Sequence, residues 1–142
     1  MGSDVIRVEL ENGLLVLLKE IHNAPLISSW IWYRVGSREE VPGITGASHW
    51  VEHMQFRGTA QFPGGFLDRE VARIGGYWNA MTSIDWTAYF LTLPAEEIDL
   101  ALRLEADRMV NSLFDPTDVE AERSVIISER QGHENSPFFL GN

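Results

Sequence analysis

Five consecutive residues carry the strongest chemical signal in the sequence, the H-x-x-E-H pattern His49-Trp50-Val51-Glu52-His53. On a helix, residues four positions apart lie on one face, so both imidazoles can point at a single metal ion. Glu52 falls within reach of a water molecule at that ion, and a carboxylate there can take the water's proton as it attacks a carbonyl carbon. The residue types and their spacing therefore fit metal-assisted hydrolysis.

A catalytic zinc takes three protein ligands and keeps one position open, so a third ligand must come from elsewhere in the chain. The sequence contains no cysteine, which leaves histidine and carboxylate, a set suited to zinc or a related first-row ion. Glu122 and Glu129 lie seven residues apart on a predicted helix and share a face with Val125 and Ile126. Acids at the border of an apolar stripe require a partner. Spacing alone leaves either glutamate open as the third ligand.

Two predicted helices position these residues. The first runs from Thr45 to Phe56 and ends at Gly58, a residue typical of helix C-termini. The second begins at Pro116, after Asp115 as N-cap, and continues to about residue 134. Around them, the pattern predicts three strand regions: a hairpin at 5–10 and 14–18, a core strand at 26–35, and a second hairpin at 77–81 and 86–93. It also predicts a helix at 66–74 and another at 95–113. The apolar stripe of the second of these helices consists of Ile98, Leu102, Ala106 and Met109.

Hairpins and long helices without regular βαβ alternation indicate an α+β fold, mainly an antiparallel sheet packed against helices. We find no repeat and no linker, so we expect residues 1–142 to form a single domain. No apolar run approaches the ~20 residues of a membrane span, and Met1-Gly2-Ser3-Asp4 does not begin a secretory signal. Cytoplasmic and periplasmic locations are both compatible with these features.

The formal net charge of −10, from 21 acidic and 11 Lys and Arg residues, argues against a nucleic-acid surface, which needs a basic footprint. Such a charge favours positively charged substrates by long-range attraction. The simpler alternative is that these acids are solvated faces of helices.

The motif and its surroundings resemble the inverted-zinc-motif peptidases, the inverzincin family of pitrilysin, insulin-degrading enzyme and the mitochondrial processing peptidases. The resemblance extends in order over essentially the whole chain. It is carried by GASHWVEHMQFRGT (46–59), GGYWNAMTSIDWTAY (75–89), LEADRMVNSLF (104–114) and ERSVIISE (122–129).

The resemblance implies a role for each site residue. It implies one Zn²⁺ per chain, bound by His49, His53 and Glu129, and it places Glu122 near the zinc and its histidines as a carboxylate that orients these ligands. Family members bind substrate as an extended strand against a sheet edge, which supplies main-chain hydrogen bonds with little demand on sequence. The matching edge consists of Asn79, Ala80 and Met81, although Asn79 on its own is typical of a turn or a strand end.

The resemblance also implies a function and partners. We expect a zinc endopeptidase that cuts peptides or unfolded segments with Glu52 as general base. Family members enclose substrate in a chamber of two halves, and the second half contributes an arginine and a tyrosine. We therefore expect a C-terminal half or partner subunit to complete the chamber of this chain, which ends at Asn142. The alternatives are a metal-binding or peptide-binding module without turnover, able to self-associate through uncovered apolar surface, and a non-catalytic scaffold subunit of the same fold.

Overall fold

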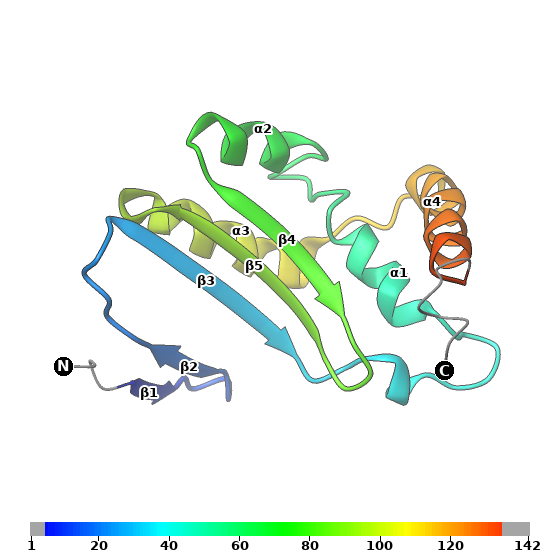
Figure 1. The fold of residues 1–142 in the computed structure, drawn as a ribbon, viewed down its shortest axis with the longest axis horizontal. Helices are drawn as coiled ribbons and strands as arrows, with labels where there is room; N and C mark the ends of the chain where they lie inside the picture. The colour runs from blue at the N-terminus through cyan, green and yellow to red at the C-terminus, as the bar shows by residue number, and fades with distance from the viewer. Residues whose placement is uncertain (1–4, 135–142) are drawn as a thin grey trace.

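The computed structural model describes residues 5–134 of the chain. A three-stranded sheet lies at the centre, a separate hairpin lies beside it toward the N-terminus, and α1 and α4 lie at one end of the sheet (Figure 1). The α+β class with antiparallel strands is therefore confirmed. None of the helices in the described part of the chain is long and apolar enough to cross a membrane.

The central sheet has the spatial order β3-β5-β4, formed by β3 (Leu26–Tyr33), β5 (Thr87–Pro94) and β4 (Tyr77–Thr82). β5 runs antiparallel to both neighbours, and its Phe90 is paired with Trp30 on one side and Asn79 on the other. The second predicted hairpin is thus confirmed as β4 and β5. Because β5 is paired on both sides, it is the most buried strand of the sheet.

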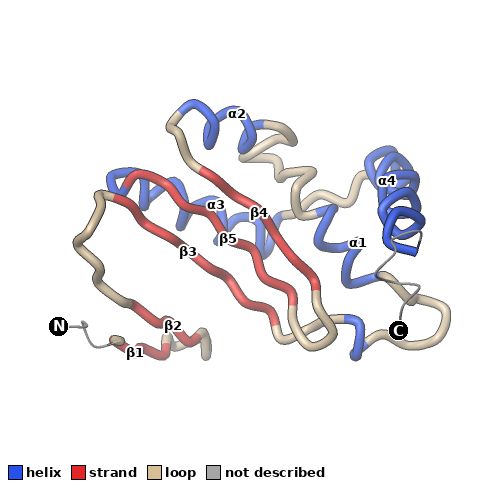
Figure 2. Tube along the Cα trace, in the orientation of Figure 1, coloured by secondary structure: helices blue, strands red, loops and turns tan. Residues whose placement is uncertain are grey.

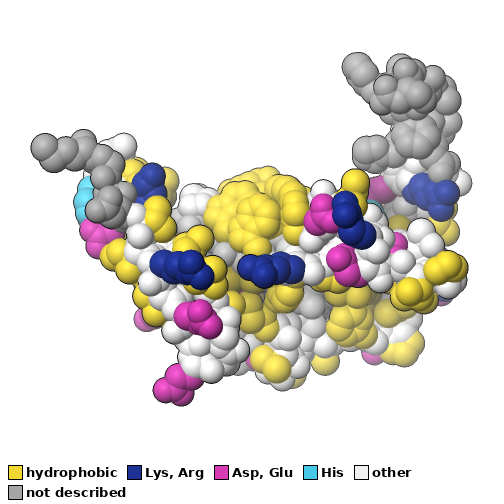
Figure 3. All heavy atoms as spheres, turned by 90° about the horizontal axis from the view of Figure 1, so that it is seen from below, with side chains coloured by type: hydrophobic (Ala, Val, Ile, Leu, Met, Phe, Trp, Pro, Cys, Tyr) yellow, Lys and Arg dark blue, Asp and Glu magenta, His cyan; other side chains and the backbone are white. Residues whose placement is uncertain are grey.

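The prediction that β3 is a core strand was wrong. Within residues 5–134, β3 is hydrogen-bonded to β5 alone and forms the edge of the sheet. Trp30 and Trp32 are 43% and 54% exposed, and Trp30 stacks on Phe90 with ring centroids 4.2 Å apart. Hydrophobic side chains are visible together on one face of the molecule (Figure 3). Aromatic and β-branched residues favour any strand, so composition does not reveal how many neighbours a strand has.

The N-terminal hairpin was predicted correctly. β1 (Ile6–Glu9) pairs antiparallel with β2 (Leu15–Leu18), and the turn between them is closed by the Leu14 amide, which donates to Asn12 Oδ1 at 3.1 Å. The hairpin is a sheet of its own and does not join β3. Most of its residues are exposed, so it contributes little to the core.

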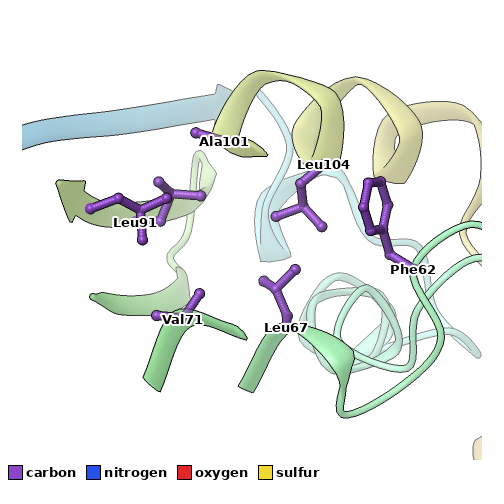
Figure 4. Packing of buried hydrophobic residues seen from close by; sticks show 7 residues of the cluster. Phe62, Leu67, Val71, Leu91, Ala101 and Leu104 are labelled. Carbon is purple, nitrogen blue, oxygen red and sulfur yellow. The ribbon is translucent and has the colours of Figure 1, made fainter. Parts of the chain in front are cut away.

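The hydrophobic core lies between the sheet, α2 (Phe66–Arg73) and α3 (Ile98–Asn111). Figure 2 shows α3 running along the sheet and α2 beyond β4. The core side chains come from β5, α2, α3 and the loop before α2: Phe62, Leu67, Val71, Leu91, Leu93, Ala101 and Leu104. Those labelled in Figure 4 point toward one another. The sheet, α2 and α3 thus share one hydrophobic core, which lies beside the candidate site.

The prediction for the apolar stripe of α3 was wrong. Its members are exposed, and the buried face of α3 is instead formed by Ala101, Leu104, Glu105 and Arg108. Arg108 donates to Glu105 at 2.6 Å and covers the Tyr89 ring at 4.3 Å. Burial raises the pKa of Tyr89, against the opposing charge of Arg108. In the sequence, Glu105 and Arg108 look like residues of a solvated helix face, but in the structure they form an ion pair and are buried.

The two site helices are α1 (Ala47–Met54) and α4 (Pro116–Glu134), which pack against each other. Both were predicted, α1 with slightly longer bounds. Asp115 is the N-cap of α4, since its Oδ1 accepts from the Thr117 amide at 2.8 Å. Short 3₁₀ turns complete the described elements, η1 (Ser37–Glu39) and η2 (Ala95–Glu97).

Candidate metal centre

Three side chains meet where α1 crosses α4. His49 and His53, one turn apart on α1, hold their rings edge to face with centroids 4.6 Å apart and their Nε2 atoms 3.2 Å apart. Glu129 of α4 places Oε2 at 3.4 Å from each of these nitrogens. Among residues 5–134, these three side chains form the one group of His, Asp or Glu residues whose ligand atoms lie close enough together to bind a single metal ion.

The dimensions of this triangle fit zinc. Ligand atoms at about 2.0–2.2 Å from a tetrahedral zinc lie about 3.3–3.6 Å from one another. The three edges here measure 3.2, 3.4 and 3.4 Å. Two neutral imidazoles and one carboxylate also match the protein ligands of known catalytic zinc sites, which keep a fourth position open. The residues present can therefore hold the metal that the sequence predicts.

Glu122, the other glutamate left open by spacing, has different contacts. Its side chain is 6% exposed, and its Oε2 lies 2.8 Å from His53 Nδ1, on the side of the ring away from Glu129. Its Oε1 forms an ion pair with Arg57. If Nδ1 carries the proton and donates to Glu122, then Nε2 is left with a lone pair facing His49 and Glu129.

Glu52 lies between the two histidines on α1 and is 9% exposed. Its Oε2 accepts a hydrogen bond from Thr82 Oγ1 at the end of β4. Its carboxylate nevertheless lines the same cleft as His49 and His53. A buried carboxylate beside a metal site is placed to act on a bound reactant.

The cleft has a volume of about 740 Å³ and opens to solvent. It is lined by α1 and the residues just after it, α4, the loop before α2, the start of α2, and one residue of the β4 edge, Asn79. Ala80 and Met81, the other residues predicted at this edge, follow Asn79 along β4 but are not among those lining the cleft. Asn79 Oδ1 accepts from the Ala80 amide at 2.9 Å, so a main-chain donor of the sheet edge is occupied by a neighbouring side chain.

The start of α1 is fixed by a carboxylate from the preceding loop. Glu40 accepts hydrogen bonds from the amides of Gly46 and Ser48 at 2.7 and 2.8 Å. Gly46 has a φ of 94°, a conformation that favours glycine. Burial alone would raise the pKa of Glu40, but these hydrogen bonds outweigh it and the net pKa is lowered. The anionic side chain thus substitutes for a conventional N-cap.

Sequence reasoning did not identify three contributors to this arrangement: Arg57, Thr82 and Glu40. Arg57 lies four residues after His53, so helical periodicity could have indicated that it reaches the same region. Glu40 and Thr82 act through long-range contacts, for which the local pattern offers no signal.

The fold and the cluster together define a class, an α+β protein with a histidine–glutamate cluster in a cleft. Residues 15–139 match the family described as insulinase (peptidase family M16). The chain belongs to this family, which confirms the resemblance seen in its motifs.

Its relatives include named zinc proteases. The chain is 33% identical over 131 residues to the Bacillus subtilis protein named "uncharacterized zinc protease YmxG", covering 92% of this chain and 32% of that protein. It is 36% identical over 132 residues to zinc protease PqqE of Helicobacter pylori, covering 92% and 30%. It is also 34% identical over 128 residues to subunit 1 of the bovine mitochondrial cytochrome b-c1 complex, covering 90% and 26%. The chain thus spans about a third or less of the length of these relatives.

Solved structures agree with this assignment. A protease from Helicobacter pylori superposes with a TM-score of 0.91 at 34% identity, covering 99% of this chain and 34% of that one. The periplasmic protease PqqL of Escherichia coli gives a TM-score of 0.88 at 27% identity, covering 99% and 16%. The fold is therefore that of a part of family M16 proteases.

Proposed function

We propose that this chain is the zinc-binding part of an endopeptidase, with His49, His53 and Glu129 as the metal ligands and Glu52 as the general base. The observation that carries the proposal is the triangle of ligand atoms with edges of 3.2–3.4 Å in a cleft that Glu52 also lines. The named zinc proteases among the relatives support it.

Each side chain of the site has its own role in the proposed hydrolysis. Zinc, when bound, supplies Lewis-acid chemistry at the carbonyl and the attacking water. Glu52 takes the proton of that water and can return it to the leaving nitrogen. Glu122 holds the His53 ring in the orientation and tautomer that present Nε2 to the cleft. Arg57 compensates the charge of Glu122.

The proposed substrate is a peptide or an unfolded segment that lies along the free edge of β4. Extended peptides bind such edges through main-chain hydrogen bonds. Asn79, Ala80 and Met81 form this edge in the proposal, and the Asn79 side chain must release the Ala80 amide before a substrate carbonyl can accept from it. We further propose that residues 1–142 act as one N-terminal domain and that a C-terminal half or partner subunit closes the cleft.

The alternative is a metal-binding or scaffold role without turnover. The similarity to a subunit of the cytochrome b-c1 complex favours it, because that relative is named for its place in an assembly. The intact H-x-x-E-H motif and the closeness of its histidines to Glu129 favour the peptidase.

A comparison of the wild type with Glu52→Gln separates these functions. Both proteins are assayed for bound zinc and incubated with a mixed peptide library that is read by mass spectrometry. The peptidase proposal expects about one zinc per chain in both proteins and cleavage by the wild type alone. Zinc without cleavage leaves the ligand set standing, and the assay is then repeated with a C-terminal half or partner subunit added; absence of cleavage there as well supports the binding module. Failure to bind zinc after reconstitution at neutral pH refutes the ligand set.

A further inference from the structure

The carboxylate of Glu52 is held by one identified hydrogen bond. Thr82 Oγ1 donates to Oε2, and no other hydrogen bond to this carboxylate occurs among residues 5–134. The contact joins α1 to the last residue of β4, thirty positions away in the sequence. Oε1 is therefore available to a reactant while Oε2 is anchored.

A second threonine, Thr87, lies next to Thr82. Thr87, the first residue of β5, is paired with Thr82 across the hairpin and is 4% exposed. Its Oγ1 donates to the main-chain carbonyl of Val35 at 3.0 Å and lies 3.4 Å from Thr82 Oγ1. The Thr87 hydroxyl thus ties this end of the hairpin to the segment that follows β3.

The turn that follows Thr82 is fixed from the other side by the segment at Gly36. The Ser37 amide donates to the Ser83 carbonyl at 3.2 Å, and the next amide donates to the Ile84 carbonyl at 2.9 Å. Gly36 approaches so closely that an added Cβ would lie 2.4 Å from the Ser83 oxygen. The backbone at Thr82 is thus held by its pairing with β5 and by the hydrogen bonds from the segment after Gly36 to the turn.

We propose that Thr82 is a positioning residue, which fixes the Glu52 carboxylate relative to the two histidines; this inference rests on the proposed function of Glu52 as base. A hydroxyl that donates to an ionised carboxylate forms a stronger hydrogen bond than a neutral pair. Without it, a carboxylate on three rotatable bonds samples several rotamers. Thr82 does not contact the reacting atoms, and it acts through Glu52.

The first test is steady-state kinetics on a peptide that the wild type cleaves. Thr82→Val keeps the shape of the side chain and removes the hydroxyl, Thr82→Ser keeps the hydroxyl, and Thr92→Val is the matched control at the other end of β5, where the side chain is half-buried. We expect Thr82→Val to lower kcat about 10- to 100-fold, as misplaced catalytic groups do. KM should change less than about threefold, because substrate binding is not altered. Thr82→Ser should recover most of kcat, and all three variants should bind zinc as the wild type does.

A second measurement does not depend on activity. Urea unfolding of the metal-free protein gives a double-mutant cycle for Thr82→Val and Glu52→Ala. We expect the shift in midpoint caused by Thr82→Val to fall by at least about half in the Glu52→Ala background, since the partner is then absent.

These outcomes separate the two claims. An unchanged kcat in Thr82→Val, or additive shifts in the cycle, would overturn the positioning role even if the wild type is a peptidase. A wild type that binds zinc but cuts no peptide, even with the half that closes the cleft added, would overturn the proposed function, and the cycle alone would then decide whether Thr82 holds Glu52.

Discussion

Replacing Glu122 tests how the second carboxylate of α4 contributes to the site. It lies 2.8 Å from His53 Nδ1 and is buried, whereas the Nε2 atom of the same ring faces the proposed zinc. Removing a carboxylate that orients a metal-bound histidine lowers metal affinity about 10- to 100-fold. That range corresponds to about 1.4–2.8 kcal/mol of binding free energy.

The two possible substitutions should fall at opposite ends of this range. Glu122→Gln keeps an oxygen that can accept from His53, so we expect about a tenfold loss of affinity. Glu122→Ala removes the acceptor, so we expect a loss near 100-fold. The charge left on Arg57 adds little in either case, because its side chain is 37% exposed and water can solvate it.

The assay is a competition titration of zinc against a chelator of known affinity. Glu120→Gln is the matched control, because Glu120 lies on the same helix but is exposed and pairs with Arg123. Its zinc affinity should equal that of the wild type. A folded Glu122→Ala variant with unchanged zinc affinity would refute the orienting role.

Three further predictions follow from individual contacts. Glu129→Ala should abolish stoichiometric zinc binding, measured by metal analysis, without changing the urea midpoint of the metal-free protein, because the side chain is 47% exposed; retained zinc would contradict its role as ligand. Gly36→Ala should lower the free energy of unfolding by about 1–3 kcal/mol, because its Cβ would clash with the Ser83 carbonyl. The control Gly132→Ala, in open space on α4, should be neutral or stabilising in the same urea titration; equal effects would refute the clash. Glu40→Gln should cost about 0.5–2 kcal/mol at pH 7. Since the folded pKa of Glu40 is lowered, its contribution is complete above the unfolded pKa of about 4.3 and is lost as pH falls through the folded value. Wild type and Glu40→Gln should therefore converge in acid, and a gap that stays constant with pH would contradict this account.

The motif helix was predictable because its signal is local. Residues i and i+4 share a helix face wherever the helix lies, so the closeness of His49 and His53 follows from the sequence. Periodicity could not choose between Glu122 and Glu129, which share a face of α4. Their different contacts depend on where α4 crosses α1, which places Glu129 at the Nε2 atoms and Glu122 at Nδ1.

The wrong predictions have a similar origin. β3 was interpreted as a core strand from its apolar and aromatic residues, but its place at the sheet edge is set by pairing with β5 alone within residues 5–134. On α3, the buried side was missed because Arg108 and Glu105 satisfy each other's charge, which hydrophobic periodicity does not detect. The contact of Thr82 with Glu52 likewise depends on two segments meeting in space.

The central claim is that two histidines and one glutamate hold a zinc ion in this chain. X-ray absorption at the zinc edge tests it most directly, on the zinc-loaded wild type. The account predicts nitrogen and oxygen neighbours at about 2.0–2.2 Å, with the scattering of two imidazoles. A zinc environment with no imidazole, or with a single one, would contradict it.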